Sequence, residues 1–321
     1  MRGSLLLLVV VASLLAGTLT GAVSLSPAEL WHGILSAQAP SADIVRNLRI
    51  PRVLLAFLVG GSLGLCGAAL QALVRNPLAE PYLLGLSGGA GLGAVIAIGL
   101  KAGSIWAIPI AAFLGALGAA ALVYRLSLVE GRRLDSRVLL LAGVVVGAFA
   151  TALMSAIIVL SDAVQLRNAF LWLLGGFSGA SWQALEIFLA YSVIPIAILF
   201  ARARTLDLLV LGDETAHHLG ADVERTRVTV YVTTALLTAA GVAACGIVGF
   251  VGLVVPHAVR RVWGPLHRTL LPVVFVASGS FLVLADAVAR TIVRPTELPV
   301  GIVTALVGVP LFALLLRRSL A

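Results

Sequence analysis

The chain consists mostly of intervals of about twenty residues that carry few or no charged side chains. These intervals are 3–28, 53–74, 81–100, 102–124, 138–161, 184–201, 228–259, 269–289 and 298–316. A charged side chain at the centre of a bilayer costs about 2.5–3.5 kcal/mol on insertion scales, whereas an apolar helix of about 20 residues crosses the hydrocarbon core. The pattern therefore predicts an all-α integral membrane protein.

The interval 228–259 is too long for one crossing. Gly246 and Gly249 offer a turn within it, so we expect two helices, 228–245 and 246–259. This division gives about ten transmembrane helices in a single domain over residues 1–321. The first run, Leu5 to Val23, exceeds the roughly 7–15 apolar residues of a secretory signal, so we expect an uncleaved first span.

The composition agrees with a membrane protein and excludes several function classes. Charged residues make up 11% of the chain, against about 25% in an ordinary globular domain. The net charge of +8 comes from scattered arginines that set membrane topology, so it does not indicate nucleic acid. Cys66 and Cys245 both lie in apolar runs, which indicates packing, and the pattern contains no metal or cofactor site. The glycine-rich run Gly88–Gly93 lies in an apolar helix and is also interpreted as packing.

The distribution of basic residues predicts the orientation. Ten crossings place both termini on one side, and a cytoplasmic placement gives fifteen basic residues inside and seven outside, as the positive-inside rule requires. The inner set is Arg2, Arg75, Arg125, Arg132, Arg133, Arg137, Arg202, Arg204, Arg225, Arg227, Arg260, Arg261, Arg268, Arg317 and Arg318. The outer set is Arg46, Arg49, Arg52, Lys101, Arg167, Arg290 and Arg294.

One long stretch, Arg202–Arg227, interrupts the apolar sequence, and we call it the polar segment. Gly212 and Gly220 predict that it forms two short helices with glycine breaks. Its place on the cytoplasmic side makes it the natural contact for a soluble partner. A solvated connector that contacts nothing is equally consistent with the spacing.

Two further groups of residues have open interpretations. Arg49 and Arg52 flank Pro51, and Arg290 and Arg294 precede the last span; together they could form a docking face for an acidic partner. The alternatives are contact with lipid headgroups or a local pair between Arg290 and an acid four residues earlier. The turn Asn76–Pro81 contains two prolines and is either structural or part of a gate.

The sequence contains no constellation of catalytic side chains. Glu186 and Asp286 are expected near the outer ends of their helices, which does not favour an intramembrane enzyme or an ion-coupled secondary transporter. These two classes are the alternatives to the interpretation below.

Several long motifs resemble those of the permease subunits of binding-protein-dependent ABC importers for iron-siderophores, haem and cobalamin. They are RIPR at 49–52, GAALQALVRNPLAEPYLLGLSGGAGLGA at 67–94, WLLGGFSGASW at 172–182, LGDETAHHLGADVERTR at 211–227, GIVGFVGLVVPHAVRR at 246–261 and ELPVGIVTALVGVP at 297–310. The resemblance covers nearly the whole chain, and the motifs occur in the order typical of this family.

The resemblance implies the permease fold of type II ABC importers, working as a homodimer in the bacterial inner membrane, surrounded by membrane lipid. It implies that a metal chelate is translocated by alternating access and that ATP is hydrolysed by two separate ATP-binding subunits, so that the permease itself is not an enzyme. A periplasmic or lipoprotein substrate-binding protein would deliver the chelate.

The resemblance also implies roles for particular residues. The coupling helices for the ATP-binding subunits would cover about 206–226, with the contact residues Leu211, Gly212, Asp213, Glu214, His218 and Gly220. Arg49, Arg52 and Arg290 match the arginines that contact the binding protein, and we add Arg294 by its position. The residues expected at the inner gate are Asn76, Leu78, Asp135 and Ser136; Asp135 stands where the family has a small polar residue.

Overall fold

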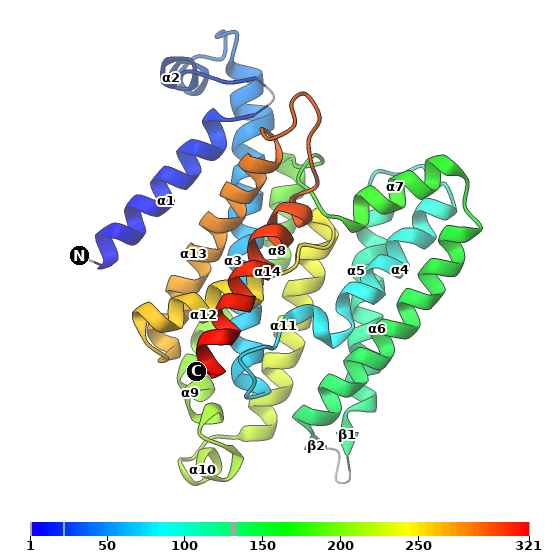
Figure 1. The fold of residues 1–321 in the computed structure, drawn as a ribbon, viewed down its shortest axis with the longest axis vertical. Coiled ribbons are helices and arrows are strands. Elements are labelled where there is room, and N and C mark those ends of the chain that lie inside the picture. The colour runs from blue at the N-terminus through cyan, green and yellow to red at the C-terminus, as the bar shows by residue number, and fades with distance from the viewer. Residues whose placement is uncertain (1, 22, 130–132, 321) are drawn as a thin grey trace.

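A computed structural model describes residues 2–21, 23–129 and 133–320 (Figure 1). Arg132, counted above as an inner charge, lies outside them. The helices of the described part are α1 Arg2–Leu19, α2 Pro27–Leu35, η1 Ile44–Arg49, α3 Ile50–Leu73, η2 Pro81–Leu84, α4 Leu86–Gly99, α5 Ala107–Leu126, α6 Ser136–Val159, α7 Ala163–Leu173, α8 Trp182–Ala201, α9 Ala203–Val210, α10 Asp213–His218, α11 Val223–Cys245, α12 Val251–Trp263, α13 His267–Ala289 and α14 Val300–Leu320. Two short antiparallel strands, β1 Leu128–Val129 and β2 Arg133–Leu134, form a hairpin between α5 and α6.

The helices confirm an all-helical membrane protein. Six helical stretches of the described part are long and apolar enough to cross a bilayer: Ile44–Leu73, α5, α6, α8, α11 and α13. Three shorter apolar helices accompany them, at Gly3–Leu19, Leu86–Gly99 and Val300–Leu314. The long axis of the bundle has two ends, which we name the α2 end and the α10 end after the helices found there (Figure 1).

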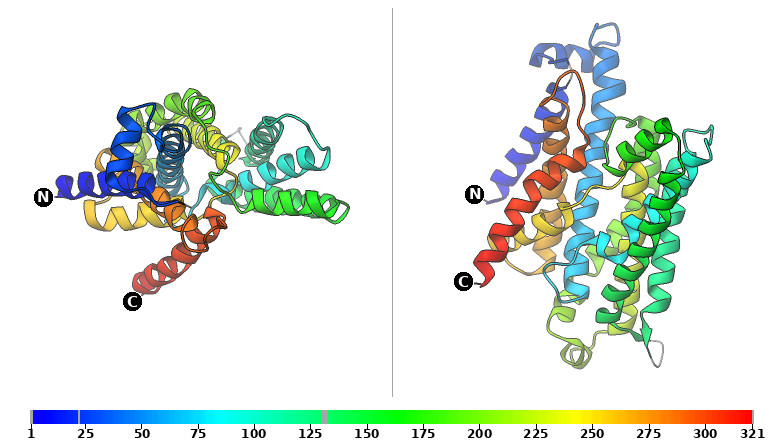
Figure 2. Two further views of the ribbon diagram at one scale, coloured as in Figure 1. Left: turned by 90° about the horizontal axis from the view of Figure 1, so that it is seen from above. Right: turned by 45° about the vertical axis from the view of Figure 1, so that its right-hand side comes forward.

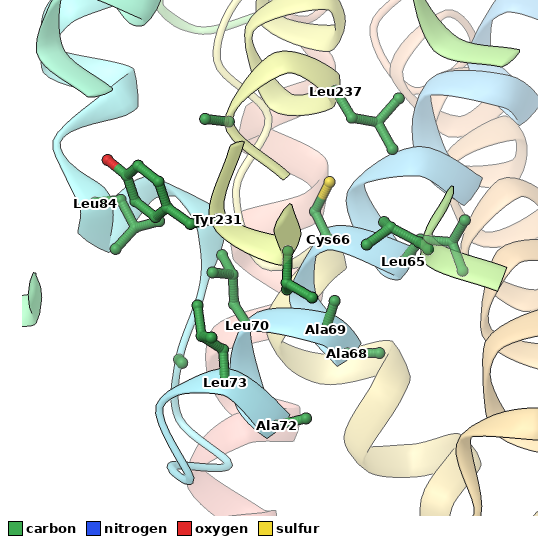
Figure 3. Packing of buried hydrophobic residues seen from close by; sticks show 14 of the residues in the cluster. Leu65, Cys66, Ala68, Ala69, Leu70, Ala72, Leu73, Leu84, Tyr231 and Leu237 are labelled. Carbon is green, nitrogen blue, oxygen red and sulfur yellow. The ribbon is translucent and has the colours of Figure 1, made fainter. Parts of the chain in front are cut away.

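Helix α3 is the centre of the bundle. The most apolar window of the stretch Ile44–Leu73, which contains α3, is 83% buried, against 28% for α5, α6 and α8, so α3 is surrounded by the rest of the chain while the other three helices each leave a face uncovered by it. Its residues Leu65, Cys66 and Leu70 pack near Tyr231 and Leu237 of α11 (Figure 3). The predicted packing role of Cys66 is consistent with this buried position.

Close helix contacts depend on glycine, as the sequence predicts. A Cβ atom at Gly60 of α3 would lie 2.6 Å from the carbonyl oxygen of Ser278 in α13, a distance no side chain tolerates. A Cβ atom at Gly89 would collide with the carbonyl group of Gly115, where α4 crosses α5. The run Gly88–Gly93 therefore serves helix packing, because its missing side chains let two backbones approach closely.

The predicted division of residues 228–259 is confirmed, because α11 ends at Cys245 and α12 begins at Val251. Gly246 (φ 71°) and Phe250 (φ 69°) turn the chain between them. The backbone N–H of Phe250 donates to a carboxylate oxygen of Glu80 at 2.6 Å. Glu80 thus supplies an acceptor where the helical ladder is interrupted.

Where helices are interrupted inside the bundle, backbone N–H and C=O groups form hydrogen bonds with backbone groups at other interruptions. The N–H of Gly176 donates to the carbonyl of Cys245 at 2.7 Å, and the N–H of Val300 donates to the carbonyl of Gly175 at 3.0 Å. The segment after α7 is therefore hydrogen-bonded both to the end of α11 and to the start of α14. Because the hydrocarbon core of a bilayer offers no hydrogen-bond partners, these bonds are what allows non-helical backbone within a membrane-spanning bundle.

The first helix is shorter than the sequence indicated. We expected one span over 3–28, but α1 ends at Leu19. A new helix, α2, begins at Pro27 because Ser26 and Glu29 form a capping box, in which the Ser26 side chain accepts from the Glu29 N–H and the Glu29 carboxylate accepts from the Ser26 N–H. Helix α2 then lies across the end of the bundle (Figures 1 and 2).

Candidate functional site

The polar segment forms two short helices, as predicted. Helices α9 and α10 are separated by Gly212, whose φ of 106° is open only to glycine, and α10 is followed by Gly220 at φ 82°. Leu206 and Leu209 are buried and hold α9 against the bundle. The other side of the segment faces away from the bundle.

The outward side of the polar segment carries exposed apolar residues. Val210, Leu211 and Leu219 are 51%, 60% and 58% exposed, close to the exposed His218 and Glu214. Apolar side chains of this size grouped at the tip of a polar structure mark an interaction surface. Predicted contact residues thus lie at the surface of the α10 end.

Asp213 connects the polar segment to two other parts of the chain. One carboxylate oxygen accepts a hydrogen bond of 2.6 Å from Nη2 of Arg227 in α11. The other lies 3.3 Å from Nη2 of Arg75, as an ion pair without hydrogen-bond alignment. Arg75 precedes the predicted gate turn directly, so a single carboxylate joins the predicted coupling residues to the predicted gate.

Arg227 and Glu224 extend this connection to the hairpin before α6. The Arg227 side chain, which is nearly buried, also donates to the carbonyl of Leu134 at 3.0 Å. Glu224 accepts from the N–H of Leu134 at 2.9 Å. The start of α11 is thereby fixed to the residue that precedes Asp135.

The predicted gate residues lie along the same connected surface. Asn76 accepts the N–H of Leu78 at 2.9 Å and so shapes the turn, while Leu78 is exposed. Ser136 donates to the carbonyl of Leu73 at 3.2 Å, which joins the start of α6 to the end of α3. The structure therefore brings the four predicted gate residues to the same end of the bundle as the predicted coupling residues.

Asp135 has a clear local role as the N-cap of α6. Its carboxylate accepts the N–H groups of Val138 at 3.0 Å and Arg137 at 2.8 Å. These hydrogen bonds favour the charged form and lower the pKa of the carboxyl below its ordinary value. Its role as the N-cap of α6 explains why position 135 holds an acidic residue.

Some connecting residues could not be found from the sequence. Asp207 of α9 accepts from the N–H of His267 at 2.8 Å and contacts Nδ1 of the same residue at 2.7 Å, which fastens the polar segment to the start of α13. Arg260 of α12 donates to Gln71 of α3 at 3.0 Å. The only signal for these pairs was charge close to the ends of apolar runs, which names no partner.

The predicted docking arginines at the α2 end are held within the protein to different degrees. Arg49 is 5% exposed and donates to the carbonyls of Thr18 at 2.7 Å and Leu19 at 2.8 Å, and also to that of Val23. Arg290 is also buried and donates to the carbonyls of Thr20 and Gly17, both at 2.9 Å. Both guanidinium groups thus satisfy the free carbonyls at the C-terminus of α1.

Arg52 belongs to an ion-pair network with two acids. It lies 2.9 Å from Asp286 and 2.9 Å from Glu297, and Asp286 also pairs with Arg290 at 2.9 Å. The local pair between Arg290 and Asp286, one of the alternatives from the sequence, is therefore confirmed. Asp286 is buried, and two cations compensate its charge.

Arg294 is the exposed member of the predicted docking set, and none of the described residues pairs with its side chain. Glu297, beside it in the same loop, is about one-third exposed. Within the described residues, no group of three or more histidine, cysteine or acidic side chains could hold a metal ion. The α2 end thus presents a charged loop above a buried ionic network.

Comparison with known proteins agrees with the motifs. Residues 5–318 match the FecCD transport family. The chain is 46% identical over 274 residues to the cobalamin import system permease protein BtuC of Halobacterium salinarum, covering 85% of this chain and 73% of that protein. It is 40% identical over 325 residues to the hemin transport system permease protein HmuU of Yersinia pestis, covering 99% and 96%.

A solved structure gives the same result for the fold. The structure described as an inward-facing conformation of a metal-chelate type ABC transporter superposes with a TM-score of 0.87 at 30% sequence identity. The match covers 98% of this chain and 97% of that chain. The likeness therefore includes the polar segment and both ends of the bundle.

Proposed function

The chain belongs to the FecCD transport family, and we propose that it is the permease subunit of an ABC importer for a metal chelate of the iron-siderophore, haem or cobalamin class. Its relatives are named as permeases for cobalamin and hemin, and the superposed structure is named as a metal-chelate transporter. The observation that carries the proposal is the match over residues 5–318, which leaves no large part of the chain for another activity.

We propose ten membrane crossings within one domain. The six long apolar stretches, the three shorter apolar helices and α12 together make ten. The positive-inside count then assigns the α10 end and both termini to the cytoplasm and the α2 end to the outside, in the bacterial inner membrane.

At the α10 end, two separate ATP-binding subunits dock on the polar segment, one on each copy of a permease homodimer. The exposed Val210, Leu211 and Leu219 supply an apolar contact. Asp213 then transmits movement of the segment to Arg75 and Arg227, and through them to the gate turn and the start of α6. Nucleotide binding and hydrolysis in the partners thereby open and close the path between the two copies.

At the α2 end, an acidic surface of a substrate-binding protein docks on the arginine cluster. Arg294 is free to contact a carboxylate directly. Arg52 can do so by exchanging Glu297, its more exposed partner, for an incoming acid. Arg49 and Arg290 support the docking surface indirectly, because they bind the carbonyls at the end of α1 beneath it.

Reconstitution tests the proposal. Proteoliposomes that hold the permease, the ATP-binding subunits from the same operon and the cognate binding protein should accumulate the chelate only with ATP. Uptake that persists without the ATP-binding subunits would reject the importer and favour a secondary transporter. A Gly212→Val variant should keep hydrolysis but lose uptake, because valine cannot adopt the backbone conformation found between α9 and α10.

A further inference from the structure

An apolar groove lies on the outside of the bundle, between α8 and α11. Its volume is about 560 Å³, and its walls are Ala190, Tyr191, Ile194, Pro195 and Ile198 of α8 and Val228, Thr229, Val232, Thr233 and Leu236 of α11, with Phe113 of α5. Seen along the bundle, α8 lies on the opposite side from α14 (Figure 2). The groove therefore opens away from the face that α14 presents.

The groove is closed at one end by aromatic side chains. The rings of Phe113 and Tyr191 pack with their centroids 5.4 Å apart. Tyr191 lies eleven residues before Arg202, the C-cap residue that directly follows α8. At 1.5 Å per residue this is about 16 Å, close to half of a hydrocarbon core that is about 30 Å thick. The groove, which ends at Ile198, together with the last turn up to Arg202 thus has the length of one membrane leaflet.

The other end of the groove, at the α10 end of the bundle, is marked by two arginines. Arg202 follows Ile198 by four residues, so it continues the wall made by α8. Arg225 precedes Thr229 by four residues and continues the wall made by α11; the Thr229 hydroxyl donates to its carbonyl at 2.6 Å. An apolar slot of one leaflet's length therefore ends between two cations.

Neither guanidinium group has an acidic partner within the part of the chain that the structure describes. Among the described residues, no side chain forms a hydrogen bond or ion pair with the guanidinium group of Arg202 or Arg225. Of the two acids just before Arg225, Asp222 uses its carboxylate to accept the backbone N–H of Arg225 at 3.0 Å. Glu224 is engaged with Leu134. The two positive charges are thus available to an anion at the membrane surface.

We propose that this groove binds one anionic phospholipid, with an acyl chain along the groove and the phosphate between Arg202 and Arg225. The apolar walls match a hydrocarbon chain, the length matches one leaflet, and the charge matches a phosphate. Basic residues at the end of an intramembrane groove are the arrangement by which membrane proteins select anionic headgroups. The site uses the two ends of the polar segment, where Arg202 follows α8 and Arg225 lies in the first turn of α11, and the proposal does not depend on what the protein transports.

The test measures lipid retention by the full-length protein. Protein reconstituted with equal amounts of phosphatidylglycerol and phosphatidylcholine is extracted in mild detergent, and bound lipid is counted by native mass spectrometry. Wild-type protein should retain phosphatidylglycerol about tenfold over phosphatidylcholine. The double variant Arg202→Gln, Arg225→Gln should retain the two lipids about equally. Ala190→Phe, which fills the groove from its exposed wall, should retain neither.

Arg204→Gln is the matched control, since it removes an exposed positive charge two residues from Arg202 but off the groove wall. It should keep the wild-type preference. Thermal unfolding of each variant checks that the fold is intact. The proposal is overturned if wild-type protein shows no preference, if the double variant keeps it, if Ala190→Phe still retains lipid, or if Arg204→Gln abolishes selectivity equally.

Discussion

Asp213 accepts a 2.6 Å hydrogen bond from Arg227, fourteen residues later, and so ties the start of α10 to the first turns of α11. The same carboxylate pairs with Arg75 beside the gate turn. Asp213 therefore connects α10 to both the turn after α3 and the start of α11, and the interaction can be tested by removing it.

Asp213→Ala should reduce both stability and coupling. The Arg227 side chain, about one-tenth exposed, would lose its carboxylate, at a cost of about 1–3 kcal/mol in the free energy of unfolding. The measurements are thermal unfolding in detergent and the ATP hydrolysed per chelate imported, which should rise. Glu186→Ala is the control, because Glu186 is exposed, has no described partner and lies in α8, outside the polar segment. Equal behaviour of the two variants would contradict a connecting role for Asp213.

Gly220→Ala should lower the free energy of unfolding only by the cost of holding alanine at a positive φ. Gly220 has a φ of 82°, and no other group lies within 4 Å of where a Cβ atom would be. The left-handed conformation costs a non-glycine residue about 1–2 kcal/mol, so we expect that loss in unfolding free energy without steric collision. Gly103→Ala is the control, because it is equally uncrowded and lacks the positive φ. A stability equal to that of the control would show that the segment adapts freely.

Arg290→Ala should release the C-terminal end of α1. Its guanidinium donates to the carbonyls of Gly17 and Thr20, and those acceptors would be left without a partner. Hydrogen exchange of the backbone around residues 17–25 should speed up while exchange in α3 stays unchanged. Arg294→Ala removes a nearby charge that holds no such contact and should leave exchange at wild-type rates.

Arg294→Gln should weaken docking of the binding protein mainly through slower association. Exposed charges act chiefly on encounter and register, so we expect a few-fold loss that shrinks as salt is raised. Surface plasmon resonance at two ionic strengths checks this. Lys101→Gln, at the same end of the bundle and 72% exposed in its side chain, removes the same charge elsewhere and should have a smaller effect.

Asp135 should give α6 a stability that depends on pH. Its pKa is lowered by the N–H groups of Val138 and Arg137, so its contribution is complete above the ordinary value of 3.8 and is lost as the pH falls through the lowered value. Asp135→Asn keeps a capping oxygen and should melt close to the wild type at neutral pH, whereas Asp135→Ala should lose about 1 kcal/mol. Melting curves at pH 7 and at pH 3 test this. A wild-type advantage over alanine that persists unchanged at pH 3 would exclude capping by the carboxylate.

The structural features that depend only on residues close together in the chain could be predicted from the sequence. Glycine at 212, 220 and 246 adopts a positive φ where helices are interrupted, and each of these breaks was visible as a glycine near the end of an apolar or charged run. The all-helical fold followed from the absence of charge over long intervals. The end of α1 was missed, because the capping box at Ser26 is itself a short polar motif inside an apolar run without charges until Glu29.

The sequence could not predict pairs formed between distant residues. Arg49 and Arg290 were expected at a surface, but both bind carbonyls at the end of α1, and no pattern in the chain links positions 49 and 290 to residues 17–23. Asp207 and His267 are a similar case, since each reads as an ordinary interfacial residue alone. Such partners are set by tertiary packing, which periodicity does not encode.

The capping of α1 by Arg290 has a consequence for the order of membrane insertion. The two groups are separated by 270 residues, so α1 leaves the ribosome and enters the bilayer long before its second arginine exists. Until α13 is synthesised, the last carbonyls of α1 have only Arg49 as a partner. Helix α1 therefore reaches its final position only after Arg290 has been made, and the α2 end of the bundle is completed long after α1 itself has formed.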